Sequence, residues 1–438
     1  MKTTYESWGR YPSVKPKQVI QITKREDIPP LDRLSTPMLA YGMGRSYGDC
    51  CLNEGGTLID TTGMSGLIAF DKKQGIIRCE AGLGLAEILE RIVPRGWFLP
   101  AVPGTKFVTV GGAIANDIHG KNHHRAGSFG CHVPQFQLLR SDGTMPLCSL
   151  ESNYDLYRAT IGGLGLTGLI LWADIQLKPI KSPFIKTESI RFKNFDEFFE
   201  LSEISNKKYE YTVSWIDCMT KGTKLGRGIF ICGNHADTDQ CQPSAATSQQ
   251  QISLSFTAPN MFLNKMTVKL FNLFYYYKGL RKHNSSIVHY NSFFFPLDSI
   301  QNWNRIYGKR GFFQYQCVVP YGDGHRAIRE LLKMIARSEN ASFLSVLKTF
   351  GDIESPGMLS FPRSGVTLAM DIANRGNKTL QLFSDLDEIV LNAGGALYPC
   401  KDARMPKKMF EASFSRLKEY REYVDDKFSS SLWRRVNR

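Results

Sequence analysis

Short apolar runs, separated by turn residues, make up much of the first 180 residues. Between Thr57 and Gly82, the runs T-L-I-D-T-T, G-L-I-A-F-D and G-I-I-R-C-E-A-G have the length and composition of β-strands. From Leu85 to Val93 the apolar residues instead recur at helical spacing, and Pro94 ends that run. Strands and a helix in this order predict a compact α+β unit.

A second region, from Lys181 to about Ala396, mixes strand-like and helix-like runs and has few glycine clusters. We expect it to cover the substrate as a separate domain, because 438 residues exceed what one hydrophobic core usually supports. The polar stretch from Asp237 to Gln251 predicts a loop. The tail, from Lys401 to Arg438, has a helical pattern and a basic end.

Two glycine-rich segments carry the first chemical signal. Residues 41–49 read Y-G-M-G-R-S-Y-G-D, and residues 102–124 read V-P-G-T-K-F-V-T-V-G-G-A-I-A-N-D-I-H-G-K-N-H-H. Glycine has no Cβ, so its backbone can adopt positive φ and bring bare N–H groups against a pyrophosphate. Two such segments predict a bound dinucleotide. The glycines concerned are Gly42, Gly44, Gly48, Gly104, Gly111 and Gly112.

A third glycine cluster, G-L-G-L-T-G at residues 163–168, formally matches the G-x-G-x-x-G fingerprint of a Rossmann fold. That fingerprint must open a helix, whereas the residues that follow have the alternation of a strand and stop at Pro179. We therefore reject a Rossmann fold. The cluster forms either a turn beside the cofactor or a purely structural turn.

Composition narrows the class of protein. With 42% hydrophobic and 22% charged residues the chain is globular, and no apolar run approaches the roughly 20 residues that span a bilayer. Its ten cysteines show no C-x-x-C spacing, so we expect reduced thiols. The first residues lack the apolar stretch of a signal peptide. We therefore expect a cytoplasmic protein.

The net charge of +14 favours anionic partners, which include nucleic acid, phosphorylated substrates and anionic membranes. Charge alone does not choose among them. The basic residues are dispersed among acidic ones and accompany no zinc-finger or RNA-recognition signature. We expect no nucleic-acid partner.

The glycine segments, together with G-F-F-Q-Y-Q at 311–316, S-F-L-S-V-L-K-T-F-G at 342–351 and Y-P-C-K-D-A-R at 398–404, resemble the vanillyl-alcohol oxidase superfamily of flavoproteins. Within it, the resemblance is to the branch that oxidises polyprenyl-phosphate pentoses. It implies an α+β fold: a two-subdomain PCMH-type FAD-binding domain, residues 1–183 completed by 396–438, and a substrate-binding domain, residues 184–395, built on an antiparallel β-sheet with flanking helices.

The resemblance also implies the cofactor and the residues that hold it. Relatives that bond FAD covalently have a histidine where this chain has Arg45, and arginine cannot form that link, so we expect dissociable, non-covalent FAD. The implied FAD-binding residues are Gly42, Gly44, Arg45, Ser46, Tyr47, Gly48, Pro103, Gly104, Thr105, Thr109, Gly111, Gly112, Ala115, Asn116, His119, Gly120, Asn122, Gly127, Ser128, Gly165 and Gly168.

Two residues are candidates for the chemistry. Lys401 stands at the place of the family's active-site lysine, and a desolvated lysine can act as a base or orient a hydroxyl. His119 is implied to face the flavin and the substrate. The i, i+4 pair of His119 and His123 also suggests half a metal site, but no cluster of cysteines or carboxylates supplies the other ligands. We expect no metal, and we expect His123 and His124 to hold the loop through hydrogen bonds.

The same resemblance implies a substrate pocket lined by Tyr47, Lys121, Trp215, Gln314, Gln316, Lys348 and Lys401. Amides can bind sugar hydroxyls and a lysine can attract a phosphate. Core packing is the alternative for Tyr47, Gln314 and Trp215. The chain also departs from the family, with Phe294, Thr367 and Ala369 where the pattern has tyrosine, asparagine and cysteine.

The resemblance implies FAD-dependent oxidation of a secondary hydroxyl on a polyprenyl-phosphate pentose. The keto sugar would pass to a short-chain NAD(P)H-dependent reductase that completes an epimerisation. The alternative on the same scaffold is a soluble oxidase of sugar lactones or alditols.

One segment, residues 259–283, suggests contact with a membrane. Lys265, Lys269 and Asn272 lie on one helical stripe, and Met, Leu, Phe and Tyr cover the rest. Such a helix lies either on an anionic bilayer surface or in the protein core. The first possibility would place the protein at the inner face of the plasma membrane.

Overall fold

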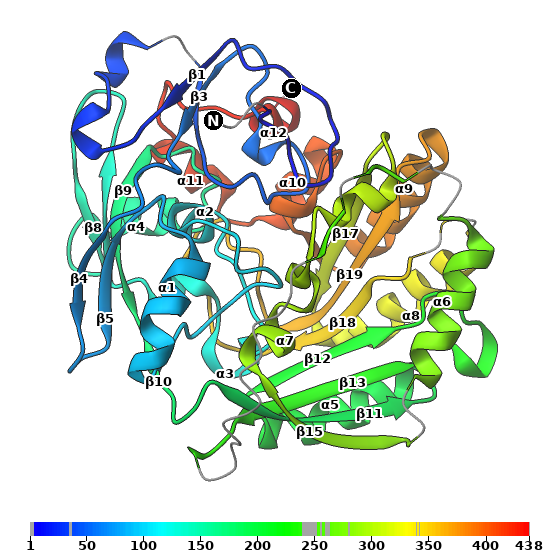
Figure 1. Ribbon diagram of the computed structural model, residues 1–438. Coiled ribbons are helices and arrows are strands. Elements are labelled where there is room, and N and C mark those ends of the chain that lie inside the picture. The colour runs from blue at the N-terminus through cyan, green and yellow to red at the C-terminus, as the bar shows by residue number, and fades with distance from the viewer. Residues whose placement is uncertain are drawn as a thin grey trace.

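Two regions of different architecture lie side by side in the computed structural model (Figure 1). The structure describes residues 4–34, 37–238, 252–254, 256–258, 263–278, 281–338, 340 and 342–437. In Figure 1 the N-terminal region is blue to cyan, the large sheet is green to orange, and the red C-terminal helices lie beside the blue strands. The loop expected at 237–251 falls almost entirely outside the described residues.

The N-terminal region contains a small parallel sheet of order β1-β3-β2, formed by β1 (Gln18–Gln21), β2 (Met38–Tyr41) and β3 (Thr57–Asp60). Strand β2 leads directly into the first glycine segment, so the sheet fixes where that segment begins. Met38 also forms a bridge with Phe428, which attaches the C-terminal segment to this sheet.

A second sheet of the N-terminal region is antiparallel, with the order β4-β5-β9-β7-β8. Its strands are β4 (Leu67–Asp71), β5 (Ile76–Glu80), β7 (Gln135–Leu139), β8 (Leu147–Ser149) and β9 (Leu169–Gln176). Strand β9 begins directly after Gly168, which confirms that a strand and not a helix follows the G-L-G-L-T-G cluster. The helix predicted from Leu85 is α1 (Leu85–Ile92), whose apolar face is buried in a hydrophobic core that includes residues of β5, β7 and β9.

An eight-stranded antiparallel sheet dominates the other region, in the order β15-β11-β13-β12-β18-β19-β17-β20. Its strands are β11 (Phe184–Phe192), β12 (Tyr211–Ile216), β13 (Gly228–His235), β15 (His283–His289), β17 (Phe312–Val319), β18 (Ser345–Phe350), β19 (Gly365–Ala373) and β20 (Ala396–Leu397). The α+β class, with an antiparallel sheet and flanking helices, is confirmed.

Three long helices pack on one face of this sheet: α5 (Phe195–Lys208), α8 (Tyr321–Arg337) and α9 (Asn377–Asn392). Side chains alternate between the two faces of a strand. Leu347 and Leu368 therefore point to the helices, in the main core, whereas their neighbours Lys348 and Ala369 line a cavity on the opposite face.

The remaining elements are short, apart from α6. They are α2 (Val110–Ala115), α3 (His123–Ala126), α4 (Tyr154–Thr160), α6 (Lys265–Tyr277), α7 (Tyr290–Phe294), α10 (Lys407–Ser413), α11 (Leu417–Tyr420), α12 (Ser431–Val436), β6 (Trp97–Phe98), β10 (Lys178–Pro179), β14 (Ile252–Ser253) and β16 (Ile300–Gln301). None of the helices in the described ranges is both long and apolar enough to cross a membrane.

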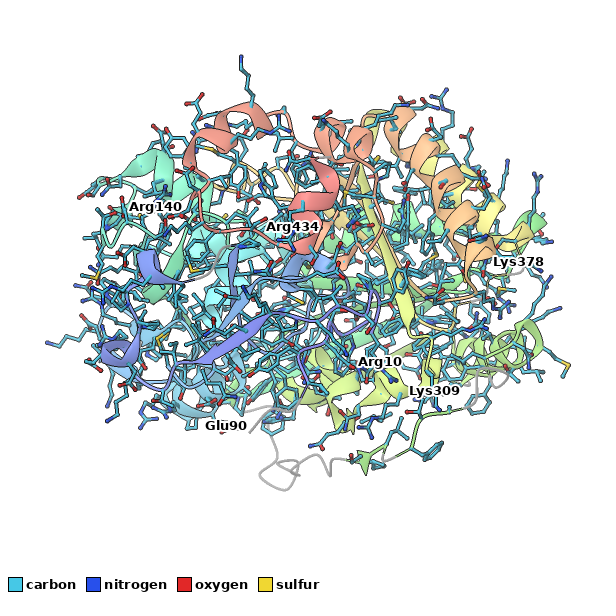
Figure 2. All side chains as sticks on the ribbon, turned by 90° about the horizontal axis from the view of Figure 1, so that it is seen from above. Arg10, Glu90, Arg140, Lys309, Lys378 and Arg434 are labelled. Carbon is cyan, nitrogen blue, oxygen red and sulfur yellow. The ribbon has the colours of Figure 1, made fainter. Side chains whose placement is uncertain are left out.

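The C-terminal segment returns to the N-terminal region and is fixed there by arginines. Arg140 and Arg434 are labelled in Figure 2. Arg140 forms an ion pair with Asp425 at 3.3 Å, and Arg434 donates to Asn53 Oδ1 at 2.8 Å. Strand β20, however, is an edge strand of the large sheet and pairs with β17. Residues 396–397 thus extend that sheet, and α10 packs on β20 and α9, while α12 and Phe428 contact the N-terminal region.

Candidate active site

A cavity of about 1300 Å³ runs between the glycine segments and the open face of the large sheet. This exceeds the roughly 300–1,000 Å³ of an ordinary small-molecule site. Of the residues predicted from the sequence, those that line it are Gly42, Gly44, Arg45, Ser46, Tyr47, Pro103, Gly104, Thr105, Thr109, Gly111, Gly112, Ala115, Asn116, His119, Gly120, Lys121, Gly165, Gly168, Trp215, Gln314, Gln316, Lys348 and Lys401. The fold therefore brings most of the predicted set to one place.

Gly48 does not line the cavity. A Cβ on this residue would stand 1.7 Å from the carbonyl oxygen of Asp402, so the glycine is needed because two backbone segments meet there. This close approach also aligns Tyr47, whose backbone N–H donates to the carbonyl of Cys400 at 2.8 Å. The position supports a structural role for Gly48 and not the cofactor contact expected from the sequence.

Asn122, Gly127 and Ser128 also lie outside the cavity lining. The Asn122 amide donates to the carbonyl of Pro100 at 2.7 Å, and Ser128 is fully buried. Gly127 has φ of +69°, the left-handed region that favours glycine. These residues shape the segment that carries His119, so the cofactor contacts expected of them are not supported.

The end of the cavity near the glycine segments fits a dinucleotide. Gly42 must be glycine because a Cβ there would lie 2.5 Å from Thr109 Oγ1. The two glycine segments lie against each other at this point. Thr109 in turn accepts the backbone N–H of Gly112 at 3.2 Å. Gly104 lines the cavity and a Cβ there would meet no atom of the described chain within 4 Å, so its backbone faces open space.

Arg45 supplies a cation and a free donor at the same end. Its guanidinium lies 4.2 Å from the ring centroid of Trp8, and its buried Nε has no hydrogen-bond partner among the described residues. A buried donor without a partner is uncommon and indicates a ligand group. The residues present therefore fit FAD.

His119 stands at the centre of a polar cluster on the sheet side. Its Nε2 lies 2.9 Å from Gln316 Nε2, and its Nδ1 lies 3.3 Å from Lys348 Nζ. Burial, and then the charge of Lys348, hold the pKa of His119 well below its usual value. The imidazole is therefore neutral, with one ring nitrogen that donates and one that accepts.

Lysines surround this cluster and lose basicity because they are buried. Burial, and then the neighbouring Lys401, lower the pKa of Lys348 to about 7. Burial and Lys348 lower the pKa of Lys121 to about 7. Lys348 also donates to the carbonyl of Gly120 at 3.2 Å, and Lys121 donates to the carbonyl of Phe294 at 3.4 Å. Both lysines can change charge near neutral pH.

Lys401 approaches the cluster from the C-terminal segment. Its Nζ lies 3.9 Å from the ring centroid of Tyr47. Burial lowers the pKa of Lys401, and the nearby Cys400 and Asp371 oppose that shift. A lysine ammonium over an aromatic ring is held by a cation–π contact, which fixes its position in the cavity.

Asp371 was missed by the sequence analysis. It faces Gln314 across the β17–β19 ladder, and Gln314 Nε2 donates to its Oδ1. The side chain is fully buried, its Oδ2 has no partner among the described residues, and burial raises its pKa to about 7. Asp371 reaches the site through the pairing of β17 with β19. This long-range contact leaves no motif in the sequence around Asp371.

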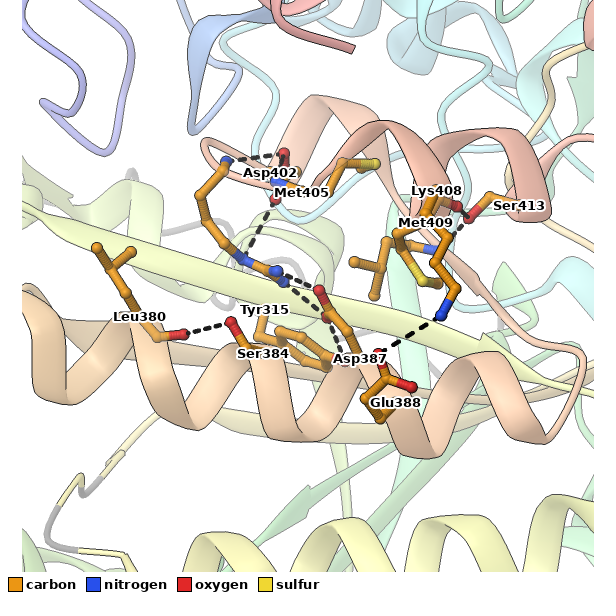
Figure 3. A network of polar contacts seen from close by, with 12 residues as sticks. Tyr315, Leu380, Ser384, Asp387, Glu388, Asp402, Met405, Lys408, Met409 and Ser413 are labelled. Atoms are coloured by element: carbon orange, nitrogen blue, oxygen red, sulfur yellow. Dashed lines mark hydrogen bonds and ion pairs between the residues drawn. The ribbon is translucent and has the colours of Figure 1, made fainter.

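Figure 3 shows a network of polar contacts around Asp387 and Asp402 that fixes the C-terminal segment. Arg404 donates to Asp387 Oδ1 at 2.9 Å, and Asp402 accepts the backbone N–H of Arg404 at 2.9 Å. Arg435 bridges Asp402 and Asp49 at 3.0 and 2.8 Å. Asp387 lies in α9 of the sheet region and Asp49 in the N-terminal region. These ion pairs therefore hold the residues around Lys401 to both regions of the protein.

The residues that depart from the family pattern lie in or beside the cavity. Phe294 and Ala369 line it, and Thr367 accepts a hydrogen bond from Gln316 Nε2 at 3.3 Å. Phe294 is almost fully buried and packs edge-on against Tyr211, with ring centroids 4.8 Å apart. Trp215 donates through Nε1 to the carbonyl of Phe343 at 2.9 Å.

The two neighbouring histidines have different environments. His124 Nε2 lies 3.1 Å from the carbonyl of Tyr209, as expected for a loop-holding residue. His123 differs from the prediction, because neither ring nitrogen has a hydrogen-bond partner among the described residues and the ring packs on Phe350 instead. No group of three potential metal ligands occurs within the described ranges.

Comparison with known proteins gives the same picture. A family model described as an FAD binding domain matches residues 16–149. The decaprenylphosphoryl-β-D-ribose oxidase of Mycolicibacterium smegmatis is 35% identical over 412 residues, which cover 91% of this chain and 89% of that protein. This chain belongs to the family of that oxidase.

Other proteins are similar to this chain over different lengths. The uncharacterized protein in the mprA 5' region of Streptomyces coelicolor is 31% identical to this chain, over 80% of this chain and 99% of that protein. Mouse L-gulonolactone oxidase is 26% identical over 45% of this chain and 47% of its own. The protein is an FAD-dependent oxidoreductase that acts on CH–OH groups.

Proposed function

We propose that this protein oxidises the 2'-hydroxyl of a polyprenyl-phosphate ribose to a ketone. The observation that carries the proposal is the continuity of the cavity, which joins the FAD-binding end to the cluster of His119, Lys348 and Lys401. The oxidase that shares 35% identity with the chain supports the sugar class. The match to L-gulonolactone oxidase covers less than half of either chain, so it gives the lactone alternative weaker support than the 35% identical oxidase gives the polyprenyl-phosphate sugar.

FAD would be held by the glycine segments, with Arg45 near its anionic or electron-rich groups. When bound, FAD accepts the hydride that leaves the oxidised carbon. The guanidinium of Arg45 cannot form a covalent link to the flavin, so we propose that the cofactor is dissociable. Gly104 exposes backbone to the cavity, where a side chain would compete with the ligand, whereas Gly42 and Gly112 leave room for Thr109.

Lys401 would remove the hydroxyl proton. Oxidation of the alcohol breaks one C–H and one O–H bond and forms the second C–O bond of the ketone, so the proton needs an acceptor. The depressed pKa of Lys401 makes its neutral amine accessible, and Tyr47 fixes the Nζ atom that receives the proton. Asp371 can then stabilise the ammonium that forms.

His119 would orient the substrate without carrying charge. Gln316 and Lys348 hold its ring from both nitrogens, and its low pKa keeps it neutral. A neutral ring avoids repulsion with the lysines and fixes the positions of Gln316 and Lys348, which would contact the sugar and the phosphate. We therefore assign His119 to positioning of the ribose.

The remaining polar groups would bind sugar and phosphate. Gln314 and Gln316 offer amides to the hydroxyls, and Lys348 and Lys121 offer positive charge to the phosphate when they are protonated. Phe294, in place of the family's tyrosine, removes one hydroxyl from the pocket. A lost hydrogen-bond partner of this kind changes preference by roughly 1–3 kcal/mol.

The keto sugar would be reduced by a separate short-chain NAD(P)H-dependent enzyme to give the epimer. We propose this partner because an epimerisation needs a second hydride donor after the hydroxyl has been oxidised.

The test is anaerobic reduction of the bound flavin by candidate substrates. A short-chain polyprenyl-phosphate ribose should bleach the flavin absorbance, whereas L-gulono-1,4-lactone and free alditols should not. The converse result, with bleaching by the lactone alone, would replace the proposal with the lactone alternative. Mass spectrometry of the product should show the loss of two hydrogens.

A further inference from the structure

We propose that the outer face of α6 docks the protein on an anionic lipid membrane beside the cavity. The outer face is defined as Met266, Leu270, Leu273, Phe274 and Tyr277. The docking surface does not depend on which sugar is oxidised, whereas its use in substrate delivery rests on the proposed function.

The outer face leaves large apolar side chains in solvent. Met266 is 68% exposed, Leu270 59% and Phe274 70%, and Leu273 and Tyr277 are also exposed. Their spacing of i, i+4, i+7, i+8 and i+11 places them on one side of the helix. An apolar stripe of this size on a surface helix indicates a binding surface.

The opposite side of α6 packs against the rest of the protein. The orientation of the helix is therefore fixed, and its outer face stays in solvent. Asn272 is fully buried and donates to Asp217 Oδ1 at 3.0 Å and to the carbonyl of Ser342 at 3.1 Å. Tyr275 packs on Trp215, with ring centroids 4.7 Å apart. Asn272 therefore lies on the inner side of α6 and not on an exposed stripe with Lys265 and Lys269, as was expected from the sequence.

The charge around α6 is complementary to anionic lipid. Residues 240–297 contain no aspartate or glutamate. Lys265 and Lys269 flank the outer face and are exposed, as are Lys278 and Arg281 beyond the end of the helix. Each basic side chain near an anionic surface contributes to binding, and apolar residues insert between the headgroups.

The inner side of α6 is also a wall of the active-site cavity. Phe271, Tyr275 and Lys278 line the cavity together with Trp215. The same helix therefore contacts both the cavity and the surrounding solvent. Docked on a membrane, α6 would let a prenyl tail stay in lipid while its sugar phosphate enters the cavity.

A second copy of the chain fits this surface less well. Pairing of two α6 helices through their outer faces would bring the lysines of both copies together, with no carboxylate from residues 240–297 to offset them. A stable interface also needs roughly 800 Å² from each partner. An anionic membrane offsets the charge and covers the apolar stripe.

The experiment measures co-sedimentation of the FAD-loaded, full-length protein with lipid vesicles. Vesicles of phosphatidylcholine alone are compared with vesicles that also contain phosphatidylglycerol, at low and high salt. The test variant is Leu273→Ser with Phe274→Ser, neither of which lines the cavity. The matched control is Ile204→Ser on α5, a side chain that is 67% exposed.

We expect the wild type and the control to bind the anionic vesicles, more weakly at high salt, and the double variant to lose roughly 100-fold in partitioning. Equal binding of the double variant and the wild type, or no binding of the wild type, would overturn the proposal. So would a wild-type dimer that the double variant converts to monomer, because the stripe would then face a second copy.

A separate measurement tests the proposed reaction independently of the docking surface. Flavin reduction by a water-soluble, short-chain substrate should be the same in the wild type, the double variant and the control. If that substrate fails to reduce any of the three while vesicle binding follows the expected pattern, the proposed function fails and the docking surface stands.

Discussion

Lys401 carries the proton transfer of the proposed reaction, and its replacement by methionine tests that role. Methionine keeps an unbranched apolar stem in the cavity wall and removes the amine. Because burial already lowers the pKa of Lys401, its charge is unfavourable in the folded state, and removing it should leave the stability unchanged or slightly raised. Retention of FAD is likewise expected.

The size of the kinetic effect follows from the neighbours of Lys401. A positioned general base contributes roughly 10²- to 10⁴-fold, or about 3–5 kcal/mol of the barrier. His119 cannot replace it, because both ring nitrogens are engaged and its pKa is depressed. The Lys348 amine contacts His119 and the Gly120 carbonyl, so it is also a poor substitute. We expect a loss of roughly 10³-fold.

The assay is anaerobic stopped-flow measurement of the limiting rate of flavin reduction as a function of pH. In the wild type the rate should rise with pH as Lys401 loses its proton, with a midpoint below the roughly 10.4 of a free lysine. The variant should be slow at every pH. Lys408→Met, which changes a lysine whose side chain is 71% exposed in α10, is the matched control.

A rate within about tenfold of the wild type, with the pH dependence intact, would remove Lys401 from the mechanism. A slow variant that has also lost its flavin or its folded state would show a structural role instead. Slow reduction with normal FAD content and a flat pH profile is the result that supports the proton transfer.

Three further predictions concern charge and packing. Arg404→Met should lower the free energy of unfolding by about 3–5 kcal/mol in urea titration, because it strands the buried carboxylate of Asp387; no change would show that the pair adds nothing. Gly48→Ala should cost about 3 kcal/mol or more by the same measurement, since its Cβ meets the Asp402 carbonyl; a wild-type midpoint would contradict the close approach. The affinity for inorganic phosphate, measured by calorimetry, should fall as pH rises through about 7, where the Lys348 and Lys121 ammonium groups lose their charge, and Lys348→Met should weaken that dependence; an unchanged pH dependence in this variant would exclude Lys348.

Local patterns in the sequence predicted the local elements well. Helical spacing from Leu85 gave α1, and the strand alternation after Gly168 gave β9, because both signals depend on residues close in sequence. The glycine segments could also be read directly, since a backbone that must approach a ligand or another chain segment excludes a Cβ. Gly48 shows the limit of that inference, because its neighbour is Asp402 rather than a ligand.

Long-range pairing could not be predicted from these patterns. Asp371 reaches the site only through its register with Gln314 on the neighbouring strand, and neither residue type nor spacing signals it. The orientation of α6 is a similar case. Its composition left a core helix and a surface helix equally possible, and the contact of Asn272 with Asp217 decides which side is buried.

The central claim is that the glycine segments and the large sheet enclose one FAD site without a covalent link. A visible spectrum of the freshly purified protein, taken before and after acid precipitation, tests it most directly. We expect flavin absorbance in the native protein and free FAD in the acid supernatant. A colourless protein that does not take up added FAD, or a pellet that keeps the yellow colour, would contradict it.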